Sequence, residues 1–382
     1  MTEQMEQDLA LFKRAIQSFL EVEVAPFYES WEHNKKIPKS LWVKLGENGF
    51  LAPDIPQQYG GLGVDFRFNM LLLEEISKAG YLALAINIMV HADICCHYLH
   101  NLGTEQQKQQ YLPKMLRGEC IAAVCMTEPA AGSDLQGIKS KALPQGEHLQ
   151  LNGSKIFITN GQNASLYIVA AKTDVNAKGS KGTSLLLVDR EAAGFSVGQN
   201  LDKMGQHCGD TSEIFFEDIL LSNDKILGEV NQGFAGLMQE LPRERLVIAC
   251  CSLAHAEGAF DLALQYANER SAFGSKLAEI QDVRFKLANM YAQLQSNRAL
   301  IESYKVKLLA KQLDTVDASV AKLTSTEMAD RVIDGCLQIF GGYGYMKEYP
   351  ISRYFVDARV QRIYGGTSEI MQEVISRRFI EG

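Results

Sequence analysis

Residues 280–308 read IQDVRFKLANMYAQLQSNRALIESYKVKL. Apolar residues recur there at alternating steps of three and four, and Asn297 is the one position that interrupts the series. Its members are Ile280, Val283, Leu287, Met290, Leu294, Ile301, Tyr304 and Leu308. This spacing keeps the apolar side chains on one side of a helix and predicts the seam of a helical bundle. Helices expected at 242–269, 315–339 and 366–379 would complete an antiparallel four-helix bundle.

The chain before this bundle divides into two further parts. Helical spacing predicts helices at 6–23, 39–49, 66–80, 81–100 and 104–117. From about residue 121 short runs rich in Ile, Val, Phe, Tyr and Thr follow, separated by Gly, Asn and Asp, and these predict antiparallel strands. The runs are IAAVCMT, HLQLNG, KIFITN, LYIVAAKT, TSLLLVD and EIFFEDILL.

We therefore predict an α+β protein of three domains. They are an N-terminal helical domain at 1–120, a middle antiparallel β-barrel or sandwich at 121–230, and a C-terminal four-helix bundle at 231–382. Strands and helices do not alternate, so a dinucleotide-binding domain built from βαβ units is not expected.

Composition narrows the possible partners. The chain has 382 residues, 46% of them hydrophobic, and a net charge of -8, which disfavours a broad nucleic-acid-binding face. Its eight cysteines have no CxxC spacing, so we expect reduced thiols, no metal site and a cytoplasmic protein. The N-terminus lacks the features of a signal peptide. The apolar stretch at 81–99 is interrupted by His91 and Asp93, which predicts a buried core helix rather than a membrane span.

The stretch LPRERLVIACC at 241–251 poses the functional question. Glu244 lies between Arg243 and Arg245, directly before an apolar run. Acids are common in the first turn of a helix and need no function there, so Glu244 is by this pattern a helix-start acid. The alternative is a carboxylate carried into an apolar pocket, where it could accept a proton.

Other motifs also allow two interpretations. MTEPAAGSD at 126–134 is either a strand-to-loop transition or a loop that presents hydroxyls and backbone N–H groups to a polar ligand. In FITN at 157–160, Phe157 and Thr159 share one strand face and could both meet a planar ligand. Arg270, in ERSAFGSKLAEIQ, is either a solvated charge or a fixed guanidinium for a pyrophosphate. GGYGYM at 341–346 follows a helix, so the glycine-rich dinucleotide fingerprint does not apply.

Taken together, these strings resemble the acyl-CoA dehydrogenase family over essentially the whole chain. MTEPAAGSD is similar to the first signature of the family, and QIFGGYGYMKEYPISRYFVDARVQRIYGGTSEI is similar to the second. The resemblance implies a helical domain, a β-domain and a four-helix bundle. It also implies FAD as cofactor, homotetramers with flavin at the subunit contacts, an acyl-CoA substrate and reoxidation by electron-transferring flavoprotein.

The resemblance extends to individual positions. It implies that Thr127, with Val124 and Met126, contacts the flavin ring, and that Thr159 approaches its N5 edge beside Phe157. It implies that FAD is held by Arg270, Phe273, Gln281, Gln338, Ile339, Phe340, Gly341 and Gly342, partly across a subunit boundary, and by Thr367, Ser368 and Glu369. Ser133 would lie beside the cofactor and the CoA part of the substrate. Ser180 and Lys181 would contact CoA. The residues that would lie along the substrate are Pro242, Arg245, Gly365 and Gly366.

The catalytic base is identified by a departure from the common pattern. Many members carry a base Glu where this chain has Gly365, in the string Tyr364-Gly365-Gly366-Thr367. A smaller branch, the long-chain and isovaleryl types, carries the base in a Glu-Arg-Leu string like that at Glu244, and this sequence most resembles the long-chain type. The resemblance thus implies Glu244 as the base and the Gly365 backbone N–H as a donor to the thioester oxygen.

The expected reaction is FAD-dependent α,β-dehydrogenation of a fatty acyl-CoA to a trans-2-enoyl-CoA. Glu244 would remove the α-proton and flavin N5 would accept the β-hydride. A cation beside Glu244 would lower its pKa, so we expect the guanidinium groups of Arg243 and Arg245 to point away from it. Medium or long chains are favoured, with branched short chains, a family-like flavin oxidase or monooxygenase, and a non-catalytic scaffold as alternatives.

Overall fold

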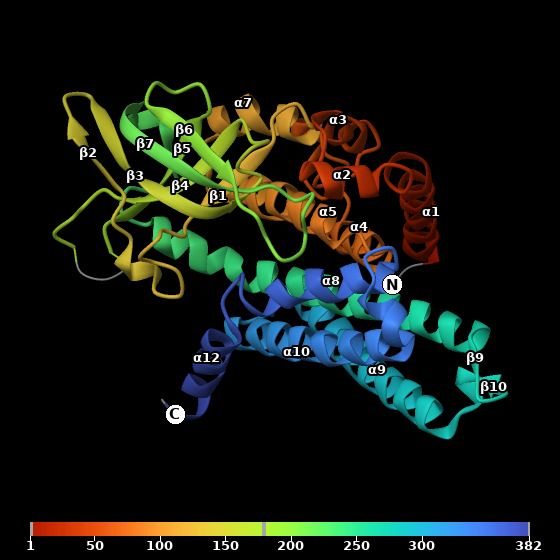
Figure 1. Cartoon of the computed structure of the whole chain (residues 1–382). Coiled ribbons are helices and arrows are strands. Elements are labelled where there is room, and N and C mark those ends of the chain that lie inside the picture. The colour runs from red at the N-terminus through yellow and green to blue at the C-terminus, as the bar shows by residue number, and fades with distance from the viewer. Residues whose placement is uncertain (1–2, 178–180, 381–382) are drawn as a thin grey trace.

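A computed structural model describes residues 3–177 and 181–380 of the chain. Its bundle forms around the seam identified in the sequence (Figure 1). Helix α9 (Gln281–Leu309) buries the central members of the apolar series, namely Leu287, Met290, Leu294, Ile301 and Tyr304. Asn297 lies on the same buried face and accepts a hydrogen bond of 2.8 Å from Ser325 Oγ of the neighbouring helix. The interruption in the apolar pattern is therefore a buried polar contact between two bundle helices.

The bundle contains two other long helices, and a short helical arm leaves it. Its elements are α8 (Gly233–Glu269), α9, α10 (Thr315–Phe340), α11 (Pro350–Ala358) and α12 (Ser368–Ile380), with short helical turns η6 (Leu277–Glu279), η7 (Gly341–Tyr345) and η8 (Arg359–Arg362). A hairpin of β9 (Ser271–Ala272) and β10 (Ser275–Lys276) joins α8 to α9. In Figure 1 this hairpin lies at one end of the bundle and α12 lies at the opposite end.

The predicted start of the first bundle helix at residue 242 is wrong. α8 begins at Gly233, and Pro242 lies inside it. A Cβ on Gly233 would lie 2.6 Å from the backbone carbon of Ser184, so the glycine lets this part of the helix pack closely against β5. Packing on the sheet therefore sustains the helix ahead of a proline, which has no N–H to donate and ordinarily ends or kinks a helix.

The N-terminal part is helical. Its elements are α1 (Glu3–Phe19), η1 (Leu20–Val24), α2 (Tyr28–Asn34), α3 (Lys39–Glu47), η2 (Gln57–Tyr59), α4 (Arg67–Lys78), α5 (Leu82–Ile88), η3 (Met89–Cys95), α6 (Cys96–Leu102) and α7 (Glu105–Leu116). Thr104 caps α7 with a capping box, in which its hydroxyl accepts the Gln107 N–H and the Gln107 side chain accepts the Thr104 N–H. Two helical stretches of the described residues, Leu82–Leu102 and Gly233–Glu269, are long and apolar enough to cross a membrane, and the most apolar part of each is 100% and 83% buried inside the fold, respectively.

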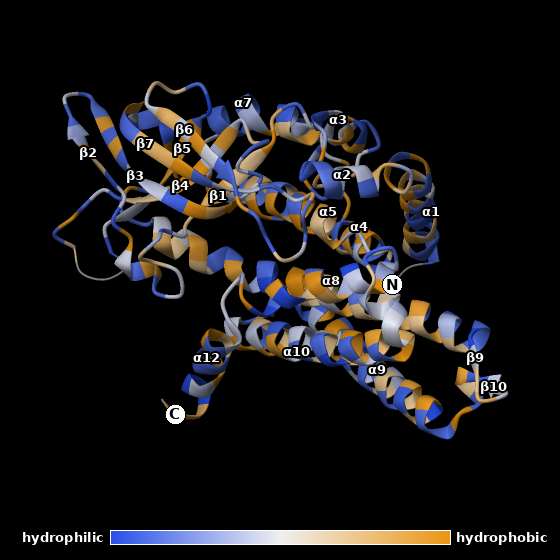
Figure 2. Cartoon of the chain, viewed as in Figure 1, coloured by the Kyte–Doolittle hydropathy of each residue, from blue (hydrophilic) through white to orange (hydrophobic). Residues whose placement is uncertain are grey.

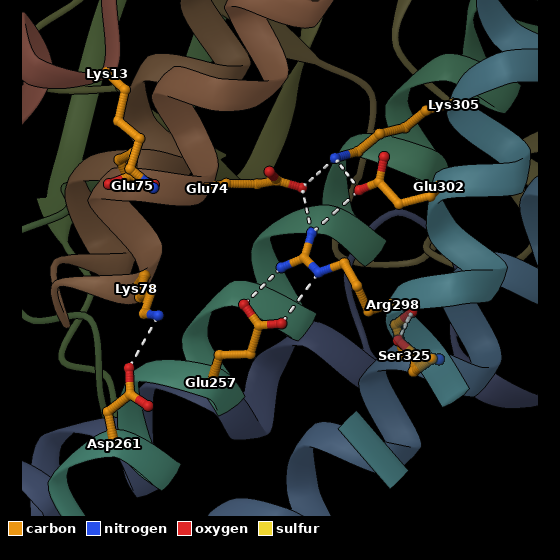
Figure 3. Close-up of polar contacts among 11 residues, drawn as sticks. Lys13, Glu74, Glu75, Lys78, Glu257, Asp261, Arg298, Glu302, Lys305 and Ser325 are labelled. Carbon is orange, nitrogen blue, oxygen red and sulfur yellow. Dashed lines mark hydrogen bonds and ion pairs between the residues drawn. The ribbon is translucent and has the colours of Figure 1, made fainter. Parts of the chain in front are cut away.

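A charged network ties this helical part to the bundle (Figure 3). Arg298 of α9 donates to both oxygens of Glu257 of α8, at 3.1 and 2.6 Å, and to Glu74 of α4 at 3.1 Å. Lys305 bonds Glu74 at 2.6 Å and Glu302 at 2.9 Å. Because Arg298, Lys305, Glu74 and Glu257 are half-buried, their pairs hold the relative positions of α4, α8 and α9 more firmly than exposed pairs would.

The middle part is a mainly antiparallel sheet with the strand order β6-β7-β3-β2-β4-β5-β8, and β1 pairs with β4 in parallel. The strands are β1 (Ala122–Cys125), β2 (Lys141–Gln145), β3 (His148–Thr159), β4 (Leu166–Lys172), β5 (Thr183–Asp189), β6 (Phe195–Asn200), β7 (Thr211–Ser222) and β8 (Ile226–Leu227), with turns η4 (Leu135–Gly137) and η5 (Asn223–Lys225). The two strands expected at 148–160 are one strand, β3. Gly153 carries the chain through a register shift at φ +148°, and its missing Cβ leaves room for Ser140.

The two faces of the sheet serve two hydrophobic cores. In β4, Leu166 and Ile168 belong to the core shared with the helices, whereas Tyr167 and Val169 belong to a second core within the β-domain. This alternation follows the two-residue period of a strand. Figure 2 shows the corresponding concentration of hydrophobic residues in the central strands and in the helices beneath them.

Candidate active site

Glu244 lies deep within α8 and not in its first turn, so the helix-start interpretation is wrong. Its side chain is buried, with 4% of the residue exposed. Tyr98 of α6, itself fully buried, donates its hydroxyl to Glu244 Oε1 at 2.6 Å. Burial raises the pKa of Glu244 to about 7, and the Tyr98 hydrogen bond only partly opposes this rise. A carboxylate that titrates near neutral pH suits a general base.

Arg243 is turned away from Glu244, as the sequence analysis predicted. Its Nη2 donates to Glu240 Oε2 at 2.7 Å and to the backbone oxygen of Asp93 at 3.0 Å. The guanidinium also lies over the Phe66 ring, 5.5 Å from its centre. Asn101 holds the other oxygen of Glu240 at 2.7 Å, so the acid partner of Arg243 is itself fixed.

Arg245 is also turned away, but toward a partner that the sequence did not suggest. Its Nε donates to the backbone oxygen of Gly365 at 3.4 Å, and its Nη1 donates to Ser319 Oγ of α10 at 3.2 Å. Arg245 thus ties α8 to the segment that precedes α12, which brings Gly365 beside the helix that carries Glu244.

The space at Gly365 is closed to a side chain. Gly365 has φ +65°, and a Cβ there would lie 2.5 Å from Cδ1 of Ile248 and 3.6 Å from Cε of Lys322. Ile248 follows Glu244 by one helical turn, so residue 365 and the Glu244 carboxylate approach the same part of α8. A glycine suits this position because of its positive φ, and a Cβ would also require the end of the Ile248 side chain to shift.

The end of β1 and the bulge in β3 form a second group of predicted site residues. Ile156 N–H donates to the Thr127 carbonyl at 3.0 Å, which places Met126 and Thr127 beside Phe157. Val124, Met126, Thr127 and Thr159 are half-buried. Phe157 is 63% exposed and adopts φ +60°, at a register shift between Lys155 and Ile158. An aromatic ring presented to the exterior at a strained backbone position, beside accessible hydroxyls, fits a planar polar cofactor.

A buried ion pair supports this group, and only its acid lies in a motif of the sequence, MTEPAAGSD. Lys155 is 1% exposed and donates to Glu128 Oε1 at 2.8 Å and to the Met126 carbonyl at 3.0 Å. Glu128 also accepts the backbone N–H groups of Lys139 and Ser140, at 2.6 and 3.0 Å. The loop after β1 is therefore fixed at its base by a charge pair whose remaining bonds are satisfied.

Other predicted substrate residues lie at the surface or are only partly buried. Ser133 and Lys181 are exposed, whereas Pro242 and Gly366 are half-buried. Ser180 lies outside the described residues.

The segment before α12 holds a third set of predicted cofactor residues. Thr367 Oγ1 accepts the Ile370 N–H at 3.3 Å, and Ser368 Oγ donates to Glu327 of α10 at 2.7 Å. Glu369 is exposed. Because Gly365 and Gly366 come directly before them, these residues lie at the same end of α10 as Glu244 and Arg245.

The remaining predicted cofactor residues lie at the opposite end of the bundle. They are Arg270, Phe273, Gln281, Gln338, Ile339, Phe340, Gly341 and Gly342, which we call the bundle-end group. At a rise of about 1.5 Å per residue, Lys322 and Gln338 are about 24 Å apart along α10. Phe273 is 98% exposed at the tip of the β9–β10 hairpin, and a Cβ on Gly341 or Gly342 would meet nothing within 4 Å. One chain therefore does not bring the bundle-end group together with the predicted cofactor residues before α12.

The site residues that sequence reasoning missed share a property. Tyr98, Lys322, Ser319 and Lys155 all contact predicted site residues through elements distant in sequence, as the 146-residue separation of Tyr98 and Glu244 illustrates. No local spacing marks such residues.

Comparison with known proteins gives a consistent result. Models of the acyl-CoA dehydrogenase N-terminal, middle and C-terminal domains match residues 6–119, 123–219 and 231–380. Mitochondrial long-chain specific acyl-CoA dehydrogenase of Rattus norvegicus is 42% identical over 371 residues, or 97% of this chain and 86% of the relative. Mitochondrial isovaleryl-CoA dehydrogenase of Solanum tuberosum is 36% identical over 372 residues, or 97% of this chain and 90% of the relative.

A solved structure agrees with these relatives. The crystal structure of acyl-CoA dehydrogenase from Geobacillus kaustophilus matches with a TM-score of 0.96 at 42% identity and covers 100% of this chain and 99% of that chain.

Proposed function

The chain belongs to the acyl-CoA dehydrogenase family, and on that basis we propose that Glu244 is the base with which it dehydrogenates a medium- or long-chain acyl-CoA. The protein is an enzyme that oxidises the CH–CH bond of an acyl-CoA, and its cofactor is FAD, on which the family depends. When bound, FAD supplies the acceptor for the hydride that leaves Cβ.

The observation that carries the proposal is the environment of the Glu244 carboxyl. It is buried, its Oε1 is held by Tyr98, and no arginine among the described residues forms an ion pair with it. Both neighbouring guanidinium groups have other partners. Oε2 has no hydrogen-bond partner among the described residues, so this oxygen remains free to take a proton. Position 365, where a base would otherwise stand, is a glycine.

The α-proton of a thioester is a weak acid, so proton removal needs help at the carbonyl oxygen. We propose that the Gly365 N–H donates to this oxygen as negative charge develops there. Arg245 would hold the peptide that follows this donor, through its bond to the Gly365 carbonyl. Preorganised donors of this kind are typically worth about 3 kcal/mol each. Ile248 and the buried residues around it would exclude water from the Glu244 carboxylate.

The cofactor site is proposed to need more than one chain. Val124, Met126, Thr127, Phe157 and Thr159 would hold the ring of FAD in one subunit. The bundle-end group would hold the rest of a neighbouring subunit's FAD, because most of its residues are exposed and it lies at the other end of α10 from the predicted cofactor residues before α12. We therefore propose a homotetramer of the family type, in the cytoplasm, with electron-transferring flavoprotein as the electron acceptor.

Two acyl classes remain as candidates. Similarity to the long-chain enzyme of Rattus norvegicus supports medium or long chains. A second candidate is a short branched acyl group. It is favoured by the position of Ile248, whose Cδ1 fills the space beside Gly365 and would leave less room for a long chain there. The isovaleryl-CoA dehydrogenase of Solanum tuberosum is among the relatives of this chain.

Anaerobic titration of the purified holoenzyme with acyl-CoAs of increasing length, together with isovaleryl-CoA, tests the proposal. We expect loss of flavin absorbance, with the tightest response at medium or long chains. A response confined to isovaleryl-CoA would establish the second candidate. Absence of bleaching with every acyl-CoA would support a non-catalytic scaffold, and rapid peroxide formation in air without an added acceptor would support an oxidase.

A further inference from the structure

Lys322 of α10 is a buried lysine with an unusual set of neighbours. The residue is 1% exposed, and its Nζ donates to the backbone oxygen of Gly366 at 2.5 Å. Within residues 3–177 and 181–380, no carboxylate forms an ion pair with it. A buried ammonium group without a paired acid costs free energy, because one backbone carbonyl replaces its hydration poorly. Stability alone therefore does not account for a lysine at this position.

A second cation lies against the same segment. Arg245 of α8 donates to the Gly365 carbonyl at 3.4 Å, and its Nη2 lies 3.6 Å from the place of a Cβ on Gly366. Burial, and then the nearby Arg245 charge, lower the pKa of Lys322 to about 7. Two successive carbonyl groups thus face two cationic side chains, which come from two different helices.

The carbonyl oxygens of Gly365 and Gly366 are thus bound, whereas the backbone N–H groups of the same two residues are free to donate hydrogen bonds. Gly365 and Gly366 both have positive φ, at +65° and +100°. In the described part of the chain, neither of their N–H groups has a hydrogen-bond acceptor. Successive backbone N–H groups in such a conformation form a binding place for negative charge. The Gly365 carbonyl shares its peptide plane with the Gly366 N–H, and the Gly366 carbonyl shares its plane with the Thr367 N–H. Arg245 and Lys322 therefore fix the two peptides that directly follow the Gly365 N–H.

We propose that Lys322 is a positioning residue for acyl-CoA dehydrogenation, which holds the Gly365–Gly366 segment so that its N–H donors meet the thioester oxygen. The aliphatic part of the Lys322 side chain lies beside Gly365, and a Cβ on Gly365 would be 3.6 Å from Lys322 Cε. Lys322 acts through the backbone and does not touch the reacting atoms. The inference rests on the proposed function, in which Glu244 generates negative charge on that oxygen.

The test uses an acyl-CoA analogue with sulfur in place of the β-carbon, such as 3-thiaoctanoyl-CoA. The sulfur prevents hydride transfer and acidifies the α-proton, so the bound analogue can ionise without reacting. Its anion beside oxidised flavin absorbs at long wavelength, and the intensity of this band against pH gives the apparent pKa of the bound analogue. Lys322→Met and Lys322→Gln are compared with wild type as holoenzymes.

We expect Lys322→Met to keep FAD and to bind the analogue, but to lower its ionisation constant about tenfold, with a similar fall in kcat and little change in KM. Lys322→Gln can still donate to the Gly366 carbonyl, so its ionisation constant and kcat should lie between those of Lys322→Met and wild type. Lys305→Met is the matched control. It removes a mostly buried lysine that bonds Glu74 and Glu302 on other elements, so it should lower the melting temperature and leave the ionisation unchanged.

Two outcomes separate this inference from the function on which it rests. If wild type bleaches with acyl-CoA while both Lys322 variants ionise the analogue as wild type does, the inference is overturned and the proposed function stands. If none of the acyl-CoAs bleaches the flavin of the wild-type enzyme, the proposed function fails and the inference fails with it. If Lys322→Met does not yield a folded holoenzyme, the comparison of Lys322→Gln with wild type decides in the same way.

Discussion

The two ends of the bundle differ in how completely one chain builds them. Around Glu244, the same chain supplies buried partners, including Tyr98 for the carboxyl and Lys322 for the Gly366 carbonyl. At the bundle-end group, Phe273 is 98% exposed, and Gly341 and Gly342 face open space. The same helix, α10, passes from one end to the other.

This difference separates two kinds of site. A carboxylate with a raised pKa must be shielded from water, so its surroundings have to be complete within the folded chain. Residues that bind a cofactor can instead be supplied from outside, because the cofactor brings its own polar groups and an adjoining copy can cover the exposed side chains. The base pocket should therefore respond to mutation through chemistry and stability, and the bundle-end group through cofactor retention and assembly.

The largest effect is expected from removing the base. Glu244→Gln should lower kcat about a thousandfold, since a general base is lost while the shape of the side chain is kept. FAD should remain bound, because Glu244 is not one of the predicted cofactor-binding residues. Stopped-flow flavin reduction measures the rate, and visible absorbance measures FAD content. Glu257→Gln, another half-buried acid of α8, is the control and should retain turnover. Near-normal flavin reduction in Glu244→Gln would remove Glu244 from the mechanism.

The second prediction concerns stability against pH in the same variant. The pKa of Glu244 is raised from 4.5 to about 7 in the fold, so the folded state binds its proton more tightly than the unfolded state does. The carboxyl therefore contributes full stability below pH 4.5 and loses it as the pH rises through 7. The wild type loses this stabilisation as the pH rises, and Glu244→Gln has no such carboxyl to lose it. The unfolding free energy of the variant minus that of wild type should therefore increase by about 3 kcal/mol from acidic to mildly alkaline pH. Denaturant unfolding from pH 4 to 8 measures the difference, and a pH-independent difference would contradict the burial of this charge.

The third prediction tests the close packing at Gly365. Gly365→Ala should lower the unfolding free energy by about 2 kcal/mol, because a Cβ is strained at positive φ and overlaps Ile248 Cδ1. Ile248→Val removes that Cδ1 atom, so in its background the alanine should cost about 1 kcal/mol less. A double-mutant cycle by denaturant unfolding measures this coupling, and additive effects would mean that Gly365 and Ile248 do not meet.

The smallest effect on stability is expected at the bundle-end group. Phe273→Ser should change the unfolding free energy of the apoprotein by less than about 0.5 kcal/mol, because the side chain is 98% exposed. It should nevertheless weaken FAD retention and assembly, as followed by absorbance after gel filtration and by sedimentation. Leu11→Ser, at another exposed apolar position (61%), is the control and should leave both unchanged. Unaltered FAD retention in Phe273→Ser would show that the bundle-end group needs no partner.

The sequence predicted the features that depend on local periodicity. The seam of α9 was identified residue by residue, and its interruption at Asn297 marked a real polar contact. Predictions from local sequence rules were wrong where close packing between elements decided the backbone path. Pro242 indicated a helix start, but packing on the sheet through Gly233 extends α8 beyond it. Gly153 indicated a break between strands, but β3 continues through it.

For the active site, the sequence determined which carboxylate to consider through its family resemblance, because the resemblance implies a base at position 365 or 244 and only Glu244 has a carboxylate. Only the tertiary structure decided that Glu244 is buried, that Arg243 and Arg245 have other partners, and that Tyr98 and Lys322 contact the site. It also decided that the bundle-end group lies at the opposite end of α10 from the predicted cofactor residues before α12. The reason is physical: helix and strand periods set the direction of a side chain on its own element, whereas its partners and its dielectric surroundings come from elements that fold against it from elsewhere in the chain.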